Sequence, residues 1–472
     1  MTQDPKSVLQ QLPKVDKLLE DSRIATLLEH HSRSRVVEEI RSYLDSLRSE
    51  ILSASRTTLP EYDALVERFV RDAEKKLLPG LRRSINGAGI ILHTALGRAP
   101  LASVAQQALM IAVDHYSTLA INLETGKRGD RNAAVEKLLK AITGAEAAVV
   151  VNNNAAATLL ILNTLAEGKE VIVSRGELVE IGGSFRIPDV MKRSGAKLVE
   201  VGTTNRTHLK DYKNAITPEA GIILKVHQSN YRIIGFTSQV EVGDLASLAH
   251  QHNLKVVDDI GSGALVDFSR WGLPKEPVVQ ESVAAGADVT CFSGDKLLGG
   301  PQCGIIVGKK EVIEKIKGNQ LMRALRCDKL TFAVLEATLL LFLDEAKLLK
   351  RHPVMKMLTM PQEEIKRRCT RLKQKLARVI GEQATMSVQQ DSSEVGSGSL
   401  AAMNLPTWVL SLEFHTLSAD LLAKKLRQCT IPIIGRIKEN KFLLDGRTIR
   451  DDEFELIMQS FRELATTLLP HA

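Results

Sequence analysis

The chain of 472 residues is predicted to form an α/β fold with a mixed, mostly parallel sheet. Three observations predict this fold. Residues 1–80 carry helical apolar stripes, residues 81–335 alternate short apolar runs with helical segments, and residues 336–472 change to helices followed by a mixed α/β tail. We therefore expect a helical N-terminal domain with its linker, a central core and a small C-terminal α/β domain, with these boundaries.

The N-terminal segment contains two stripes of apolar residues at helical spacing. One stripe covers residues 36–51 and the other covers residues 65–77, with Pro60 before the second stripe and Gly80 after it. Residues 1–80 contain 13 Lys/Arg and 14 Asp/Glu, although the whole chain has a formal net charge of +7. The segment is therefore not a basic arm, and its composition alone favours a bundle for dimerisation or core capping.

The central segment reads as strands joined by helical crossovers. A helical stretch such as 240–250 between two apolar runs is typical of a βαβ unit. The clearest strand-like runs are 147–151, 170–174, 197–201, 221–226 and 255–259.

Lys296 lies between a further apolar run, residues 287–292, and a glycine-proline turn at residues 299–301. A lysine at the exit of a buried strand is partly desolvated, which lowers its pKa and frees the amine as a nucleophile. Such a lysine can form a Schiff base with pyridoxal 5'-phosphate, and the glycines let the backbone pass close to a flat ring. By itself the motif fits a solvated turn lysine equally well.

A pyridoxal phosphate site also needs an acid at the pyridine nitrogen. Asp259 ends a predicted strand, starts the pattern Asp-x-Gly-Ser-Gly, and precedes Lys296 by 37 residues. Asp258 is expected to point to the other face of the strand, but it stays open as an alternative. An ordinary turn aspartate would give the same local pattern.

A phosphate cradle is predicted at Asn152, Asn153 and Asn154, between a strand and an alanine-rich helix start. Helix N-termini offer free N–H groups and a positive dipole end to an anion, although an asparagine here can also be a simple N-cap. Ser262 and Ser293, beside the aspartate and the lysine, are assigned to the same cofactor site. Cradle, aspartate and lysine, each after a strand, occur in this order in aspartate-aminotransferase-like (fold type I) enzymes.

Several longer motifs resemble the bacterial selenocysteine synthase family, the L-seryl-tRNA(Sec) selenium transferases. The resemblance spans nearly the whole chain. Two places depart from the family pattern: residues 395–400, where a glycine-rich loop is expected, and Gly446, where the family has a bulkier residue. The segments that resemble the family are Leu12–Leu19, Ser84–Arg98, Ser174–Pro188, Lys225–Tyr231, Pro432–Ile437 and Asp445–Thr448.

This resemblance implies a reaction that replaces the serine hydroxyl of seryl-tRNA(Sec) with selenium. The expected route is β-elimination through an aminoacrylyl-tRNA, followed by addition of selenium from selenophosphate. Lys296 would remove the Cα proton, and Asp295 beside it would help to move protons or would be only a turn residue. The resemblance also implies that residues 1–80 recognise tRNA. It further implies a homo-oligomer, at least a dimer, and suggests a decamer made of five dimers.

A seryl ester has no free α-carboxylate, so arginines of the site can serve a dianionic donor instead. Arg323 and Arg326 are spaced i, i+3 and are predicted to share a helix face. Arg131 is also assigned a catalytic role. For any one of these arginines a surface salt bridge is the simpler explanation. The proposed selenophosphate ligands are Arg98, Arg131, Arg323 and Arg326.

Other features limit the function classes. Five cysteines without a CxxC pair argue against a disulfide framework or a zinc site, and no metal is expected. The sequence shows no signal segment and no apolar run of membrane length, so we expect a cytoplasmic protein without membrane or DNA partners. The basic cluster at 366–378 fits a solvated helix face or a tRNA contact. The residue that stacks on the cofactor ring, Glu180 or His227, stays open.

Two other functions remain as alternatives. One is a related pyridoxal-phosphate-dependent lyase that eliminates from a free amino acid or sugar acid, and the other is a regulatory RNA-binding protein with a vestigial fold. The helical N-terminal segment with its Leu-Pro-x-Val-Asp motif at 12–16 argues against the first. Lys296, Asp259 and the asparagine turn argue against the second.

Overall fold

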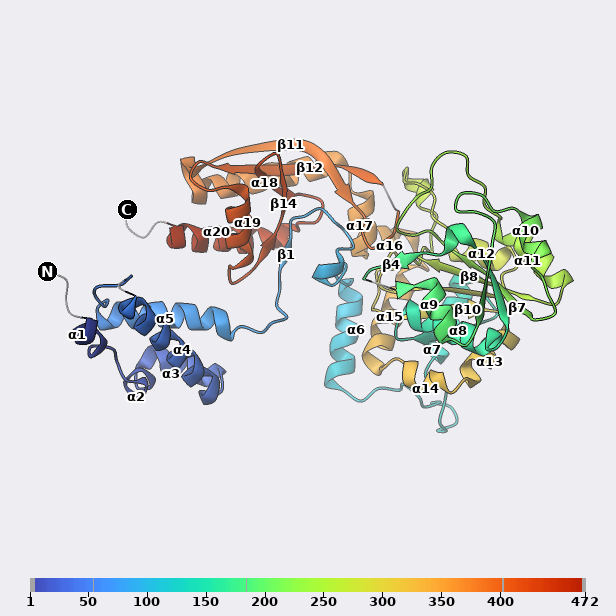
Figure 1. The fold of residues 1–472 in the computed structure, drawn as a ribbon, viewed down its shortest axis with the longest axis horizontal. Helices are drawn as coiled ribbons and strands as arrows, with labels where there is room; N and C mark the ends of the chain where they lie inside the picture. Colours follow the sequence, from blue (N-terminus) through green and yellow to red (C-terminus); the bar gives the residue numbers. More distant parts are fainter. Residues whose placement is uncertain (1–4, 54, 184, 401–402, 469–472) are drawn as a thin grey trace. The chain divides into compact units, whose positions relative to one another are not determined.

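A computed structural model describes residues 5–53, 55–183, 185–400 and 403–468. The chain divides into two compact units. Figure 1 labels its helices and strands and colours the ribbon along the sequence. One unit comprises residues 1–85 and 425–433, and the other comprises residues 86–424 and 434–472. The three-domain boundaries at 80 and 335 stay predictions. Ser184, within one of the family-like motifs, lies outside the described residues.

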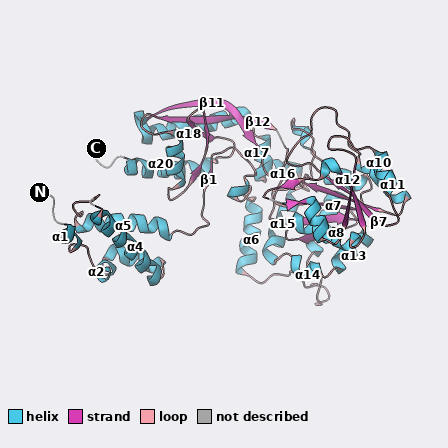
Figure 2. Ribbon diagram, viewed as in Figure 1, coloured by secondary structure: helices cyan, strands magenta, loops and turns pink. Residues whose placement is uncertain are grey.

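The N-terminal segment forms helices, which are cyan in Figure 2. These helices pack around their own apolar core. Both predicted stripes are confirmed, because the buried side chains of α4 and α5 follow them and face the same cluster. Asp21 caps α3 by accepting a hydrogen bond from the Arg23 amide. The helices are α1 (Pro5–Leu9), α2 (Val15–Leu19), α3 (Ser22–His30), α4 (Arg33–Leu52) and α5 (Tyr62–Leu77).

A seven-stranded sheet forms the centre of the larger unit, in the order β2-β10-β9-β8-β7-β3-β6. All neighbouring strands run parallel except β10, which pairs antiparallel with β2 and with β9. The strands are β2 (Ala147–Val151), β3 (Glu170–Ser174), β6 (Lys197–Val201), β7 (Ala220–Val226), β8 (Lys255–Gly261), β9 (Val289–Ser293) and β10 (Gly304–Gly308).

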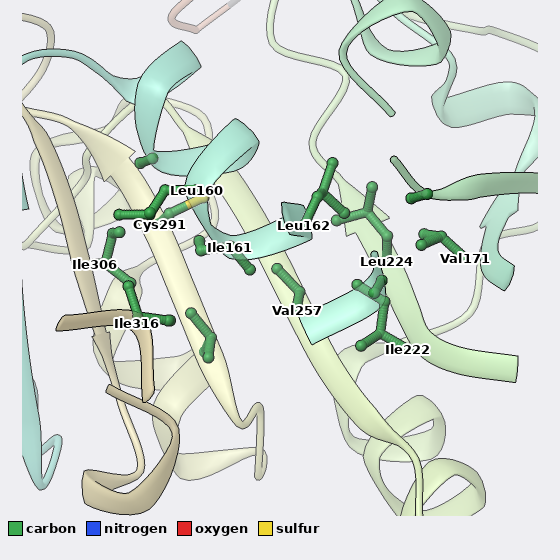
Figure 3. Packing of buried hydrophobic residues seen from close by; sticks show 14 of the residues in the cluster. Leu160, Ile161, Leu162, Val171, Ile222, Leu224, Val257, Cys291, Ile306 and Ile316 are labelled. Atoms are coloured by element: carbon green, nitrogen blue, oxygen red, sulfur yellow. The ribbon is translucent and has the colours of Figure 1, made fainter. Parts of the chain in front are cut away.

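Helices cover both faces of this sheet, which explains why its strands are nearly continuous apolar runs. In β2, Val149 and Val151 belong to the cluster of α8 (Asn154–Ala166), whereas Ala148 and Val150 belong to the cluster of α7 (Ala133–Thr143) on the opposite face. Figure 3 shows the first cluster, in which leucine and isoleucine side chains of α8 lie over β7, β8 and β9. Alternating residues of one strand therefore serve two layers.

The C-terminal part contains a four-stranded antiparallel sheet, ordered β11-β12-β15-β14. Helix α18 (Gln362–Ile380) buries Ile365, Cys369 and Leu372 and lies against β11, β12 and α20 (Phe454–Leu468). The buried Asp445 accepts hydrogen bonds from Ser393 and Thr407. The strands are β11 (Ala384–Glu394), β12 (Asn404–Phe414), β14 (Arg436–Lys438) and β15 (Lys441–Asp445).

Shorter elements connect these layers. In the described ranges, no helix has both the length and the apolar character needed to cross a bilayer. The remaining helices are α6 (Ser103–Asp114), α9 (Ile187–Arg193), α10 (Leu209–Asn214), α11 (Val242–Gln251), α12 (Val279–Ala284), α13 (Lys310–Gly318), α14 (Leu321–Leu325), α15 (Lys329–Leu341), α16 (Glu345–Arg351), α17 (Pro353–Thr359) and α19 (Ala419–Arg427). The short strands are β1 (Ile85–Asn86), β4 (Glu180–Ile181), β5 (Phe185–Arg186) and β13 (Ile433–Ile434).

Candidate active site

The topology brings the predicted cofactor residues to one edge of the sheet. Strands β7, β8 and β9 are parallel, and β2 runs in the same direction because β10 pairs antiparallel with both β9 and β2. The carboxyl ends of β2, β8 and β9 therefore face the same way. These ends lead into the asparagine turn, Asp259 and Lys296, so the edge is the expected place for a ligand in an open α/β sheet.

Lys296 is buried in the turn after β9, with 6% of its surface exposed. The turn is held by backbone bonds, including one of 3.1 Å from the Leu297 amide to the Ser262 carbonyl. Burial lowers the pKa of the Lys296 amine, and the nearby positive charge of Arg98 lowers it further. No salt bridge to this amine occurs within the described ranges. The side chain is thus a desolvated and reactive amine.

Asp259 lies at the end of β8, on the face covered by α8. Its carboxylate accepts hydrogen bonds from Asn154 Nδ2 at 2.8 Å and Thr158 Oγ1 at 2.9 Å. Burial raises the pKa of Asp259, while these two bonds act in the opposite direction. The carboxyl group is therefore held in a fixed orientation at the edge that also carries Lys296.

Asp258 points to the opposite face of the same strand, as the alternation of a strand requires. Its carboxylate accepts a hydrogen bond of 2.7 Å from Ser282 of α12. Burial raises the pKa of Asp258 to about 6. It shares no hydrogen-bond partner with Asp259, so only Asp259 is joined to the asparagine turn.

The three asparagines of the turn differ in what they contact. Asn153 caps α8 by accepting a 2.9 Å bond from the Ala156 amide, which is the ordinary N-cap role. Asn152 is exposed, and its backbone N–H donates to the Leu325 carbonyl at 2.9 Å. Asn154 reaches Asp259. Their joint action on a phosphate stays a prediction, while the start of α8 provides the N–H groups for it.

The residues at this edge fit pyridoxal phosphate. Among the described side chains, Asn154 Oδ1 and Ser262 Oγ are buried without a hydrogen-bond partner, an arrangement that is costly unless a ligand completes it. Gly263 lets the turn lie against Ser293, because a Cβ there would stand 2.4 Å from the Ser293 carbonyl oxygen. A reactive amine, an oriented acid and unsatisfied polar atoms therefore surround one place.

Arg98 and Asp295 form an ion pair beside Lys296. Arg98 Nε lies 3.3 Å from Asp295 Oδ2, and its Nη1 donates to the Ser397 hydroxyl. Arg98 adopts a left-handed backbone conformation with φ of 71°. That conformation is strained for a residue with a side chain, and such strain often marks functional sites.

The other three predicted arginines form a separate positive cluster next to the asparagine turn. Arg131 Nη1 donates to the Cys327 carbonyl at 3.0 Å, and the charges of Arg131 and Arg323 lower the pKa of Arg326. The backbone of Arg326 forms a bridge with Val151. In the described part of the chain none of the three has a carboxylate partner, so a surface salt bridge does not explain them.

One prediction about this cluster is wrong. Helix α14 ends at Leu325, and Arg326 has extended backbone angles, so Arg323 and Arg326 do not share a helix face. The two charges are nevertheless close enough to influence each other. Strand-like pairing of Arg326 with the end of β2 replaces the last helical turn.

Sequence reasoning missed two sets of contacts. Thr158 was not assigned to Asp259, although it stands four residues after Asn154 on one helix face. His227 Nε2 hydrogen-bonds the buried Glu276 at 3.2 Å, and the His227 amide donates to the Asp259 carbonyl at 2.9 Å. No local pattern marks Glu276. A cavity of about 750 Å³ adjoins this pair and Asp258.

Glu180 and the basic cluster at residues 366–378 both form ion pairs on the surface. Glu180 pairs with Arg186 at 2.6 Å on the surface. In α18, Arg371 pairs with Asp451 and Lys375 pairs with Glu455, so acids of the same unit neutralise part of the basic cluster. Arg367 is exposed on the same helix.

Comparison with known proteins gives a consistent result across the chain. The family model described as L-seryl-tRNA selenium transferase matches residues 84–450, and the model described as selenocysteine synthase N terminal matches residues 9–48. L-seryl-tRNA(Sec) selenium transferase of Geobacter sulfurreducens is 47% identical over 464 residues, covering 98% of this chain and 100% of the relative. The protein of the same name from Carboxydothermus hydrogenoformans is 48% identical, covering 95% and 96%.

Among solved structures, D-glucosaminate-6-phosphate ammonia-lyase aligns with a TM-score of 0.54 and 21% identity, covering 82% of this chain and 97% of that one. At this identity the likeness concerns the fold alone. The aspartate-aminotransferase-like, fold type I architecture predicted from the sequence is confirmed.

Proposed function

The chain belongs to the L-seryl-tRNA(Sec) selenium transferase family, and we propose that the edge of its central sheet is the active site of that reaction. The enzyme converts L-seryl-tRNA(Sec) to L-selenocysteinyl-tRNA(Sec) with pyridoxal 5'-phosphate as cofactor. The observation that carries the site assignment is the buried Lys296. It has no carboxylate partner among the described residues, and Asp259 lies near the carboxyl end of β8 at the same edge of the sheet. A lyase for free small molecules is not favoured, since the N-terminal family model also matches.

We assign the cofactor to four residues of this edge. Lys296 would hold its aldehyde carbon and Asp259 its ring nitrogen, while Asn154 and Ser262 offer their unpartnered buried oxygens to its polar groups. When bound, pyridoxal phosphate withdraws electrons from the Cα atom of the seryl group.

The chain itself supplies the proton transfers. Burial lowers the pKa of Lys296 and so favours the neutral amine, the form that can take the Cα proton. Asp259, oriented by Asn154 and Thr158, would hold the ring nitrogen of the cofactor and favour its protonated form. The proton that Lys296 takes from Cα can then pass to the departing hydroxyl, and Asp295, which lies next to Lys296 with its side chain 17% exposed, would assist that transfer.

The arginine cluster suits the selenium donor. Arg131, Arg323 and Arg326 have no carboxylate partner in the described ranges, and their charges disfavour one another until an anion is present. The guanidinium fork matches phosphate oxygens, which favours selenophosphate as the ligand. Arg98, the fourth predicted ligand, contacts Asp295 and would act closer to Lys296.

We propose that residues 1–80 recognise tRNA(Sec) and that the enzyme acts in the cytoplasm as a homo-oligomer. The independent core of the N-terminal unit supports the first proposal. Met110, Ile111 and Val113 of α6 are more than half exposed, as an interface with a second copy of the chain would require. An aminoacylated tRNA as substrate is consistent with the proposal of a cytoplasmic enzyme, because such tRNAs belong to the translation machinery of the cytoplasm.

The decisive experiment incubates the holoenzyme with seryl-tRNA(Sec) and selenophosphate and measures selenocysteinyl-tRNA(Sec). Seryl-tRNA(Ser) and free serine serve as competing substrates, and Lys296→Ala serves as the inactive control. We expect product only from seryl-tRNA(Sec), and borohydride should fix the cofactor on Lys296. Turnover of free serine in place of the tRNA would support the lyase alternative.

A further inference from the structure

The loop between β11 and β12 has an unusual backbone. Gly396, Ser397, Gly398 and Leu400 all have positive φ values, of 83°, 57°, 62° and 49°. Ser397 and Leu400 are not glycines, and residues with a side chain rarely adopt this backbone conformation. The base of the loop is fixed, because the Val395 carbonyl accepts a 2.7 Å bond from the Leu92 amide. Residues 395–400 of the loop are therefore held in one strained shape by contacts with the central core.

The first contact runs through Ser397. Its hydroxyl donates to the Leu92 carbonyl and accepts a hydrogen bond from Arg98 Nη1. Arg98 Nε in turn lies 3.3 Å from Asp295, the residue before Lys296. With its hydroxyl already oriented by Leu92, Ser397 fixes the direction of the Arg98 guanidinium.

The second contact runs through the backbone of Leu400. Its amide donates to Glu276 Oε1 at 2.8 Å, and Glu276 Oε2 lies 3.2 Å from His227 Nε2. The His227 amide donates to the Asp259 carbonyl at 2.9 Å. One short loop is thus connected to Asp295 through Arg98. It is also connected to the Asp259 carbonyl through the Glu276–His227 pair.

We propose that Ser397 and the Leu400 amide are positioning groups, which hold Arg98 beside Asp295 and the Glu276–His227 pair beside Asp259. The strain of the loop is the cost of this arrangement. The inference rests on the proposed function, because that function names the reaction whose rate would change. The contacts themselves involve only residues around Lys296 and Asp259.

Ser397→Gly is the informative variant, since glycine accepts the left-handed backbone and removes only the hydroxyl. The readout is the pH titration of the visible absorbance of bound pyridoxal phosphate. We expect its midpoint to rise, because Arg98 is released and its cation no longer opposes protonation near Lys296. With seryl-tRNA(Sec), kcat should fall by up to about 100-fold with little change in KM.

Two comparisons separate positioning from general damage. In an Arg98→Gln background, Ser397→Gly should cause no further shift of the midpoint, because Ser397 acts through Arg98. Ser399→Ala is the matched control, since Ser399 is buried in the same loop and its hydroxyl has no hydrogen-bond partner among the described residues. Its midpoint should equal that of the unaltered enzyme.

An unchanged midpoint in Ser397→Gly, an equal shift in Ser399→Ala, or a further shift in the Arg98→Gln background would each overturn the proposal. The titration needs only bound cofactor, so it remains informative even if the unaltered protein fails to convert seryl-tRNA(Sec). That failure would instead count against the proposed function.

Discussion

At the scale of single residues, the site depends on removing charged groups from water and then orienting them. Lys296 and Asp259 are both buried. Burial lowers the pKa of Lys296 and raises that of Asp259, so it favours the neutral form of each group. Hydrogen bonds from Asn154 and Thr158 recover part of the cost for Asp259. Asp258, one residue earlier, has the opposite orientation and Ser282 as its partner. Adjacent aspartates therefore offer a matched pair for experiment.

We predict that Asp259→Asn slows turnover by several orders of magnitude while Asp258→Asn slows it little. Each loss of about 1.4 kcal/mol of transition-state stabilisation is tenfold in rate, and only Asp259 is joined to the cofactor edge. Single-turnover rates of Cα deprotonation measure the effect. Near-normal rates in Asp259→Asn together with slow deprotonation in Asp258→Asn would assign the ring nitrogen to Asp258 instead.

Asp258 should make stability depend on pH. Burial raises its pKa in the folded chain from the ordinary value of 3.8 to about 6, so the folded state binds the proton more tightly than the unfolded state. The free energy of unfolding should therefore fall as pH rises from about 4 to about 6, by roughly 3 kcal/mol from this group. Denaturant titrations of the unaltered protein and Asp258→Asn measure it, and a parallel pH dependence in both would contradict it.

At the scale of elements, strand ends and helix starts place the chemistry. The end of β2 leads through the asparagine turn into α8, and the early end of α14 brings Arg326 beside β2. Three arginines then lie together without carboxylate partners in the described ranges. Basic residues of α18 contrast with them, since Arg371 and Lys375 pair with acids.

Arg131→Lys should therefore slow selenium addition while seryl-tRNA(Sec) still binds. Lysine retains the charge but loses the fork that matches a phosphate, so the apparent affinity for selenophosphate should fall. Arg270→Lys is the control, because Arg270 pairs with Glu345 on the surface. Stopped-flow kinetics with varied donor measure the step. Weakened tRNA affinity with unchanged donor affinity would identify the cluster as a nucleic-acid contact.

At the scale of the whole molecule, the proposed tRNA recognition and the proposed chemistry fall in different compact units. The N-terminal helices share a core in which Leu18, Ile40 and Phe69 are buried. The cofactor residues all belong to the other unit. This division predicts that the two activities can be separated by truncation.

Deletion of residues 1–80 should leave cofactor binding intact and abolish the preference for tRNA(Sec) over tRNA(Ser). The deletion retains Ile85, whose amide donates to the Pro432 carbonyl at 2.8 Å. Filter binding of both tRNAs and the visible absorbance of the cofactor are the measurements. If discrimination survives, recognition lies in the larger unit, and replacing the exposed Arg367 and Arg378 of α18 with glutamine would test that helix.

The sequence by itself determined the local elements and the order of the chemical groups. Predicted runs at 147–151, 170–174 and 197–201 coincide with β2, β3 and β6, because alternation and apolar content are properties of neighbouring residues. Lys296 and Asp259 were recognisable because each stands at a strand end. Tertiary structure alone decided the antiparallel insertion of β10, the extended backbone of Arg326, and the contacts from Ser397 and Leu400 to the site. These features join segments far apart in the chain, and such pairing depends on burial and packing of the whole unit, which no local pattern encodes.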